Sequence, residues 1–187
     1  MSNAFLNFLN QFNTLSEESI CAIEENSHLQ NFSKGTILLK EGKVCDSLYY
    51  IQKGCVRGTH EVDGKEITYW FGFEDTMVTS FHSFISGKPA NETIILMEDT
   101  AFTVIRKENL EKLYNLYPDI DRTGRLITEK YYVMLEERTF SYMFKTAKER
   151  YENLLVSAPH ILQRVPLGYI ASYLGITQET LSRIRKM

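Results

Sequence analysis

Hydrophobic positions near the N-terminus recur three or four residues apart, which predicts a helix. This apolar stripe consists of Phe5, Phe8, Leu9 and Phe12. A second helix is expected to begin after Ser16, a residue that can cap it, and to end near Ser27. An aromatic stripe of this kind is more typical of a packing surface than of a cofactor site.

Between Phe32 and about Ile105 the pattern changes to short β-favouring runs separated by Gly and Asp turns. The predicted strands are Thr36–Leu39, Ser47–Gln52, Cys55–Val62, Glu66–Phe71, Thr93–Met97 and Ala101–Ile105. Asp63-Gly64 predicts a tight hairpin, because a type I′ turn needs positive φ at both central positions. Many strands joined by short turns predict a compact antiparallel barrel or roll.

Helical spacing returns after Ile105, first in Lys107–Leu116 and then in a longer helix beginning near Asp119. Small or apolar residues recur along the longer helix at alternating intervals of four and three, over about two heptads. They are Ile120, Gly124, Ile127, Tyr131 and Met134. The pattern fits a contact between two copies of the chain and fits a buried helix equally well. A further helix over Thr146–Ser157 indicates a small second domain that begins near Phe140.

The last segment, Val165–Met187, predicts two short helices joined by a tight turn. Gly175 can end the first helix in a left-handed conformation, and Thr177 can cap the second. Leu181 and Ile184 would then face the apolar side of the first helix, which consists of Leu167, Ile170, Ala171 and Leu174. The opposite face would expose side chains that can bind base edges and phosphates, namely Gln178, Ser182, Arg183, Arg185 and Lys186. This is the pattern of a helix-turn-helix.

Charge is distributed unevenly along the 187 residues, of which 43% are hydrophobic and 24% charged. From Arg138 onward, 8 Lys and Arg face 3 Asp and Glu, a net charge of +5, while the preceding part carries −8. A basic end on an acidic body suits nucleic-acid binding at that end alone. The three cysteines form no metal or disulfide pattern, and no catalytic constellation or cofactor motif is present. Without a membrane span or leader pattern, we expect a cytoplasmic protein that is not an enzyme and needs no cofactor.

The order of these parts resembles the Crp-Fnr family of bacterial transcription regulators, the cyclic-nucleotide receptor proteins. The matching stretches are Phe32–Gly42, Asp46–Gly54, Asp63–Glu66, Thr146–Tyr151 and Val165–Lys186. The resemblance implies an α+β fold: an N-terminal antiparallel β-roll of cyclic-nucleotide-binding, jelly-roll type with flanking helices, a long dimerisation helix and a C-terminal helix-turn-helix. It divides the chain into a sensor domain over 1–117, the dimerisation helix over 118–139 and a DNA-binding domain over 140–187.

The resemblance also implies a homodimer, paired along the long helix at the seam residues, that binds a palindromic site on double-stranded DNA. It places Gln178, Glu179 and Arg183 at the base-reading positions. It assigns the contacts with the DNA backbone to Thr177, Thr180, Ser182 and Lys186. Because family members usually have Arg at the place of Gln178, we expect a different half-site. The family's β-hairpin wing follows the recognition helix, and since the sequence ends at Met187 we expect it to be truncated.

The resemblance is weakest at the cyclic-nucleotide pocket. Members that bind cyclic AMP hold the ribose with a Gly-Glu pair and the phosphate with an Arg later in the sequence. In this chain Thr79-Ser80 stands near the position of the Gly-Glu pair, and Asn91-Glu92 stands where the Arg would be. A glutamate would repel a phosphate, so we expect no appreciable cyclic-AMP binding. The candidate pocket residues are Thr79, Ser80, His82, Glu92 and Thr93, which suit a small polar or cationic ligand. An altered or vestigial pocket filled by aromatic residues is the favoured alternative.

The leading functional hypothesis is therefore a dimeric DNA-binding transcription regulator that does not respond to cyclic AMP. The alternative is a cyclic-nucleotide-binding-like sensor or protein-interaction module with a degenerate helix-turn-helix. The expected partners are DNA and a second copy of the chain, not a membrane; a small-molecule effector is left open.

Overall fold

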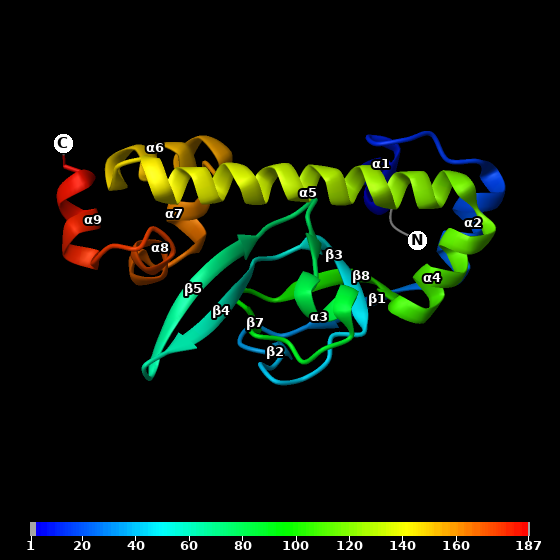
Figure 1. Cartoon of the computed structure of the whole chain (residues 1–187), viewed down its shortest axis with the longest axis horizontal. Helices are drawn as coiled ribbons and strands as arrows, with labels where there is room; N and C mark the ends of the chain where they lie inside the picture. The colour runs from blue at the N-terminus through cyan, green and yellow to red at the C-terminus, as the bar shows by residue number, and fades with distance from the viewer. Residues whose placement is uncertain (1–2, 187) are drawn as a thin grey trace.

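A computed structural model describes residues 3–186 and shows a β-roll beneath one long helix, with helices gathered at both ends (Figure 1). The roll contains β1 (Ser27–Phe32), β2 (Ile37–Leu39), β3 (Ser47–Lys53), β4 (Val56–Val62), β5 (Lys65–Gly72), β6 (Met77–Val78), β7 (Thr93–Leu96) and β8 (Thr100–Arg106). The helices are α1 (Asn3–Asn10), α2 (Glu17–Glu25), α3 (Phe81–Ser86), α4 (Lys107–Leu116), α5 (Pro118–Phe144), α6 (Ala147–Ser157), α7 (Ile161–Arg164), α8 (Leu167–Tyr173) and α9 (Gln178–Ile184).

The strands form two antiparallel sheets of four, in the orders β1-β8-β3-β6 and β2-β7-β4-β5. Their inward side chains make a continuous apolar interior: Ile51, Val56, Val78, Ile94, Leu96, Phe102 and Val104. Residues of alternating burial along β7 show the period of two expected of strands with one buried face. The predicted antiparallel roll is confirmed.

Two predicted local features are also present. At the β4–β5 hairpin, Asp63 has φ 50° and Gly64 has φ 72°, as a type I′ turn requires. Ser16 caps α2 by accepting a hydrogen bond from the backbone N–H of Ser19 at 3.1 Å. Both features depend on residues that are close neighbours in the chain, which is why the sequence predicts them well.

The sequence pattern missed β1, which follows α2 directly and pairs with β8 from Ser27↔Ile105 to Phe32↔Thr100. The four central residues of β1 are exposed, and Leu29 keeps 58% of its surface in solvent. A strand without alternating burial lacks the period of two, so only its partner strand defines it. The short strand β6 and the helix α3 were likewise absent from the predicted elements.

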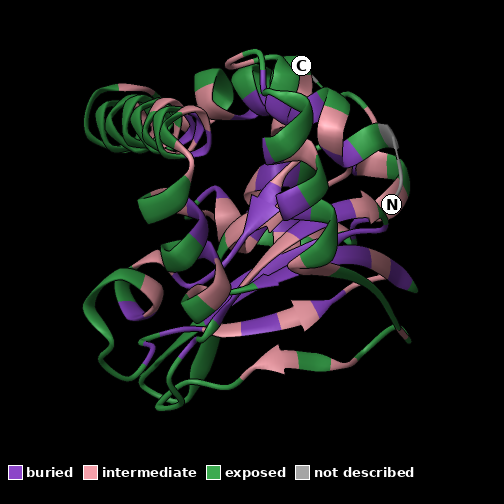
Figure 2. Ribbon diagram, turned by 90° about the vertical axis from the view of Figure 1, so that its right-hand side faces the viewer, coloured by how far each residue is buried: buried purple, intermediate pink, exposed green. Residues whose placement is uncertain are grey.

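The long helix α5 runs for 27 residues and continues past the predicted end at residue 139 to Phe144. The break before the C-terminal helices therefore lies at Lys145, and the boundary predicted at 139/140 falls inside a helix. Thr146 then begins α6 with a capping box, in which its side chain and that of Glu149 each accept from the other residue's backbone N–H. Buried residues concentrate in the central strands, whereas the helices around them also carry broad exposed faces (Figure 2).

The predicted seam of α5 packs mainly inside its own protomer, which corrects its assignment as a dimer contact. Ile120 and Ile127 are buried in the cluster formed with α1, α2 and α4. The Tyr131 hydroxyl accepts from the backbone N–H of Met77 at 2.8 Å. Met134, in contrast, is 50% exposed. The buried-helix interpretation thus holds for the first half of α5, because the roll and the N-terminal helices cover this face.

Candidate nucleic-acid interface

The helix-turn-helix is built as its sequence predicts. Gly175 ends α8 with φ 67°, and the Thr177 hydroxyl caps α9 by accepting from the Thr180 N–H at 3.1 Å. Leu181 is fully buried on the inner face of α9. There it joins the buried side chains Ile170, Ala171 and Leu174 of the preceding helix and turn. This packing sets which face of α9 is presented to solvent.

The outer face of α9 carries the predicted base-reading residues, and all three are exposed. Arg183 lies 3.7 Å from Glu179 in an ion pair whose side chains are 70% and 83% exposed. Such a pair contributes little in water, so either group can exchange it for another partner. The Gln178 amide oxygen is close to α8, 3.4 Å from the point where a Cβ on Gly168 would stand. All three side chains are thus exposed on α9, with Glu179 and Arg183 paired and Gln178 directed toward α8.

The predicted backbone-contact residues fall into two groups. Ser182 and Lys186 are exposed beside Arg183. The Thr177 hydroxyl is already engaged in capping α9 and lies 3.0 Å from that of Thr180. Thr177 therefore has a structural role that its sequence assignment as a DNA contact did not include. Met187, the last residue of the predicted domain, lies outside the described residues.

Several basic side chains of the C-terminal part form hydrogen bonds within the protein and do not add to a positively charged surface. Arg150 donates to the carbonyls of Lys145 at 2.7 Å and Leu174 at 3.0 Å. Arg138 donates to the carbonyl of Tyr69. The exposed basic residues of this part are Lys148, Arg183, Arg185 and Lys186. Three of these four belong to α9 or the turn after it, so the available positive charge is concentrated there.

The C-terminal helices dock onto the roll along β5. The Ser172 hydroxyl of α8 accepts from the backbone N–H of Thr68 at 2.9 Å. The buried guanidinium of Arg57 lies 3.8 Å from the centre of the Tyr169 ring. These contacts hold α8 against the roll and leave α9 at the outer end of the molecule (Figure 1).

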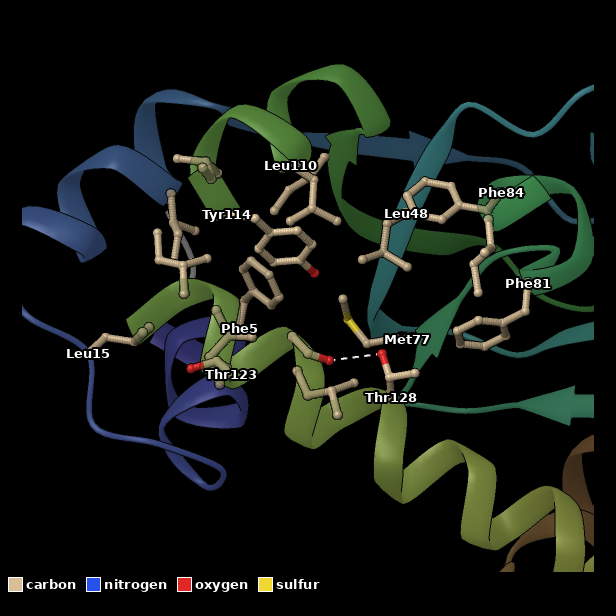
Figure 3. Close-up of a pocket in the computed structure, with 18 residues that line it drawn as sticks. Phe5, Leu15, Leu48, Met77, Phe81, Phe84, Leu110, Tyr114, Thr123 and Thr128 are labelled. Atoms are coloured by element: carbon tan, nitrogen blue, oxygen red, sulfur yellow. Dashed lines mark hydrogen bonds between the residues drawn. The ribbon is translucent and has the colours of Figure 1, made fainter. Parts of the chain in front are cut away.

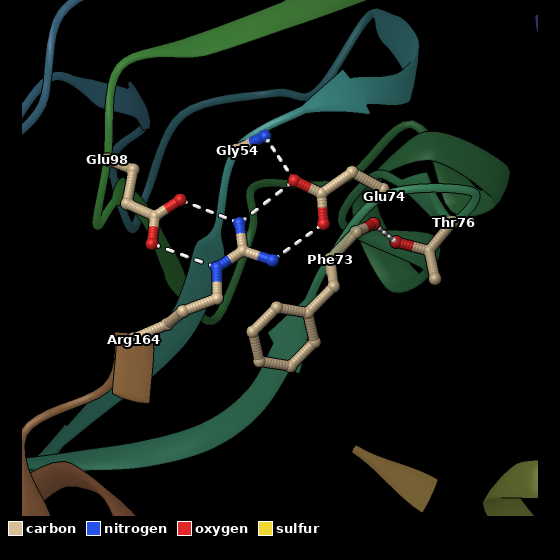
Figure 4. A network of polar contacts seen from close by, with 6 residues as sticks. All are labelled: Gly54, Phe73, Glu74, Thr76, Glu98 and Arg164. Atoms are coloured by element: carbon tan, nitrogen blue, oxygen red, sulfur yellow. Dashed lines mark hydrogen bonds and ion pairs between the residues drawn. The ribbon is translucent and has the colours of Figure 1, made fainter. Parts of the chain in front are cut away.

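Arg164, at the end of α7, joins two glutamates of the roll (Figure 4). Its guanidinium donates to both oxygens of Glu98, at 3.0 and 2.6 Å, and to both oxygens of Glu74, at 2.6 and 2.9 Å. Burial alone would raise the pKa of Glu74, but the hydrogen bonds from Arg164 and from the Gly54 N–H hold this pKa at about 2. The two carboxylates, led by Glu98, raise the pKa of Arg164. This planar double fork fixes α7 to the roll.

Trp70 is partly buried and packs against the apolar interior of the roll. Its indole N–H donates to a carboxylate oxygen of Glu92 at 2.6 Å, and Glu92 is only 6% exposed. The indole covers Gly58, where an added Cβ would stand 2.2 Å from the indole nitrogen. Trp70 was not among the predicted site residues, although it is the single tryptophan of the chain.

The other predicted pocket residues do not converge on one site. Thr79 donates to the carbonyl of Ser47 at 3.0 Å. The Thr93 hydroxyl accepts from the backbone N–H of Glu41 at 3.1 Å. His82 is exposed on α3, whereas Ser80 is buried with a hydroxyl that has no partner in the described part of the chain. Thr79, Glu92 and Thr93 thus have different partners within the chain, and the assignment of these residues to an effector pocket stays a prediction.

Neither a metal site nor a membrane-spanning segment is found among residues 3–186. In this range no cluster of three or more His, Cys, Asp or Glu side chains is placed to hold an ion. No helix there has the length and apolar character needed to cross a bilayer. Cys45 and Cys55 are buried free thiols, and burial raises the pKa of Cys55 to about 12.

Residues 29–117 match the sequence profile of the cyclic nucleotide-binding domain. This part of the chain is therefore similar to cyclic nucleotide-binding domains. The match covers the strands of the roll from β1 onward together with α3 and α4, and it ends where α5 begins. No curated protein sequence matches the chain at a significant level.

Solved structures extend the likeness beyond this domain. FixK2 from Bradyrhizobium japonicum is 20% identical, with a TM-score of 0.73 over 86% of this chain and 83% of its own. A regulator assigned to the Crp/Fnr family from Eubacterium rectale is 21% identical, with a TM-score of 0.73 over 96% of this chain and 86% of its own. CLP from Xanthomonas campestris, a c-di-GMP responsive global regulator, is 19% identical, with a TM-score of 0.66 over 91% of this chain and 90% of its own. The chain thus has the fold of Crp/Fnr-type regulators.

Proposed function

We propose that this protein is a dimeric DNA-binding transcription regulator of the Crp-Fnr type that does not respond to cyclic AMP. The observation that carries the proposal is the placement of α9: Leu181 is buried, whereas Gln178, Glu179 and Arg183 face solvent. Arg can bind guanine through two hydrogen bonds, Gln can pair with adenine, and Glu can accept from cytosine. The fold shared with Crp/Fnr-type regulators supports the same conclusion.

Selection of bound sequences from a random DNA pool, followed by mobility-shift titration at two salt concentrations, tests this proposal. We expect a palindromic site and an affinity that falls as salt rises. Arg183→Ala should weaken binding to the selected site by about 1–3 kcal/mol and relax the preference at one base pair. Arg125→Ala is the matched control, because it removes an exposed arginine of α5 far from α9 in the chain. No shift of any sequence even at low salt would contradict DNA binding.

Dimerisation is proposed along α5 from Leu126 to Phe144, through residues other than the predicted seam. Leu126 is partly exposed, and Val133, Phe140 and Phe144 are 49%, 56% and 66% exposed. Their spacing of seven, seven and four residues places them along one stripe of the helix. An apolar stripe of this length needs a covering surface, and a second α5 can supply one.

Light-scattering mass in solution tests the dimer. Phe140→Glu should shift the protein toward a monomer, because it places a charge inside the proposed contact. Val156→Glu is the control: Val156 is 83% exposed on α6, outside the stripe. A wild-type monomer at micromolar concentration, or a Phe140→Glu variant that remains fully dimeric, would contradict the proposed contact.

The lack of a cyclic-AMP response is supported by the hydrogen-bonded pair of Glu92 and Trp70 in the roll. Glu92 presents a carboxylate where a phosphate would need a cation, and Trp70 takes up the adjoining space. Calorimetry with cyclic AMP should therefore show no binding. Micromolar affinity would overturn this part of the proposal and leave DNA binding unaffected.

A sensor or interaction module with a degenerate helix-turn-helix is the second candidate. The docking of α8 on β5 favours it, because Ser172 and Tyr169 are engaged by the roll. A dimeric protein that shifts no DNA at low salt would support this alternative.

A further inference from the structure

An apolar cavity of about 180 Å³ lies between the N-terminal part of α5, the neighbouring helices and the roll (Figure 3). Its walls come from α1, α2, α4, the first half of α5, α3 and the adjoining strands of the roll. Phe5 of α1 and Leu110 of α4 line it on one side, while Leu48, Met77 and Phe84 line it on the side of the roll.

The 18 residues that line this cavity include no Asp, Glu, Lys, Arg or His. Two of the three hydroxyls that line it are already engaged within α5. Thr123 donates to the carbonyl of Asp119 at 2.7 Å, and Thr128 donates to that of Gly124 at 2.9 Å. Because an unpaired charge is costly to bury among such groups, the cavity excludes ions and phosphates.

The third hydroxyl, that of Tyr114, forms no hydrogen bond with the other lining residues, and Figure 3 shows its oxygen directed in among their side chains. Its position depends on Gly124, since a Cβ there would stand 2.4 Å from the phenol oxygen. Burial raises the pKa of Tyr114 to about 12, so the hydroxyl keeps its proton at neutral pH. The cavity therefore offers one unused hydrogen-bond donor in apolar surroundings.

We propose that this cavity binds a small neutral molecule of single-ring size whose one hydrogen-bond acceptor takes the proton of the Tyr114 hydroxyl. Volume sets the size: an apolar cavity of about 150 Å³ binds benzene, so a cavity slightly larger holds one ring with a short polar substituent. The donor sets the polarity, because a hydroxyl in apolar surroundings that is not paired with the other lining residues gains a hydrogen bond from an acceptor that reaches it.

The position of the cavity gives its occupancy a structural consequence. Phe81 and Phe84 of α3 form one wall, while Ile127 and Thr128 of α5 form another. A ligand between them would tie the roll to the helix that leads to the C-terminal domain. A role as an effector rests on the proposed function, but the binding itself does not.

A matched pair of probes, acetophenone and ethylbenzene, tests the site by calorimetry and thermal melting of the full chain without DNA. The two compounds have nearly the same shape, and only acetophenone carries an acceptor. We expect both to bind and to raise the melting temperature. Tyr114→Phe should weaken the binding of acetophenone by about 5-fold, which corresponds to the loss of one net hydrogen bond. The affinity for ethylbenzene should not change.

Leu48→Phe provides a second test, because the larger ring fills the cavity from β3. This variant should bind neither probe. Its melting temperature without probe should not fall, since the added ring fills empty space. The proposal is overturned if neither probe binds wild-type protein at millimolar concentration, or if Tyr114→Phe weakens both probes equally. Because DNA is absent from these measurements, failure of the site and failure of the regulator hypothesis are separate results.

Discussion

The interior of the roll and the outer face of α9 carry similar polar side chains but use them in opposite ways. In the roll, Glu92 accepts from Trp70, and Thr79 donates to a backbone carbonyl. On α9, Gln178 is exposed and Arg183 has only a solvent-exposed ion pair. Side chains whose partners lie within the chain stabilise the fold, whereas those left in solvent are available for another molecule. Because of this difference, we assign the proposed DNA-recognition surface to α9 and not to the roll.

The largest effect that can test this comparison is expected in the roll. Trp70→Ala should lower the free energy of unfolding by about 3 kcal/mol, because it empties part of the interior and leaves Glu92 without its donor. Urea unfolding measures this loss. Trp70→Phe keeps one aromatic ring but loses the N–H and part of the indole volume, so its cost should be smaller, about 1–2 kcal/mol. A loss below about 1 kcal/mol for Trp70→Ala would mean that the indole is not a structural part of the roll.

A smaller effect is expected where the roll meets the C-terminal helices. Arg164→Ala leaves Glu74 and Glu98 side by side without their shared cation, and should cost about 1–2 kcal/mol in urea unfolding. Arg164→Lys keeps the charge but cannot form the planar double fork, so we expect an intermediate cost. Equal stability of all three proteins would show that the docking of α7 depends on apolar contacts alone.

The same network should respond to acid. Because the pKa of Glu74 is about 2 in the folded chain against an ordinary value of 4.5, its contribution is complete above pH 4.5 and disappears as the pH falls toward 2. The Glu74 side chain is 36% exposed, so solvent screening keeps this contribution below about 1 kcal/mol. The difference in unfolding free energy between wild type and Glu74→Gln should therefore be smaller at pH 3 than at pH 6. A constant difference would contradict the charged pair.

The smallest effect on stability is expected on α9 itself. Arg183→Ala should change the free energy of unfolding by no more than about 0.5 kcal/mol, since the side chain is exposed and its pair with Glu179 is weak. Thermal melting of this variant beside wild type checks the expectation. A large loss would mean that Arg183 stabilises the fold, and the contrast between α9 and the roll would fail.

The sequence by itself determined the features that depend on neighbouring residues. Gly175 ends α8, Thr177 caps α9, and Asp63-Gly64 closes a hairpin, because the backbone preference at each position is local. The order of strands and helices follows from the spacing of apolar residues, which is why the β-roll and the two-helix motif were predicted.

The tertiary structure decided which partner each side chain meets. Trp70 and Glu92 are separated by 22 residues, and Arg164 and Glu74 by 90. Only strand register and the docking of helices bring such residues together. The same reason explains α5: its heptad spacing fits either a partner or the chain's own core, and closure of the N-terminal helices over Ile120 and Ile127 selects the core. Local periodicity specifies a helix and its apolar face, but the surface that covers this face is defined by the rest of the fold.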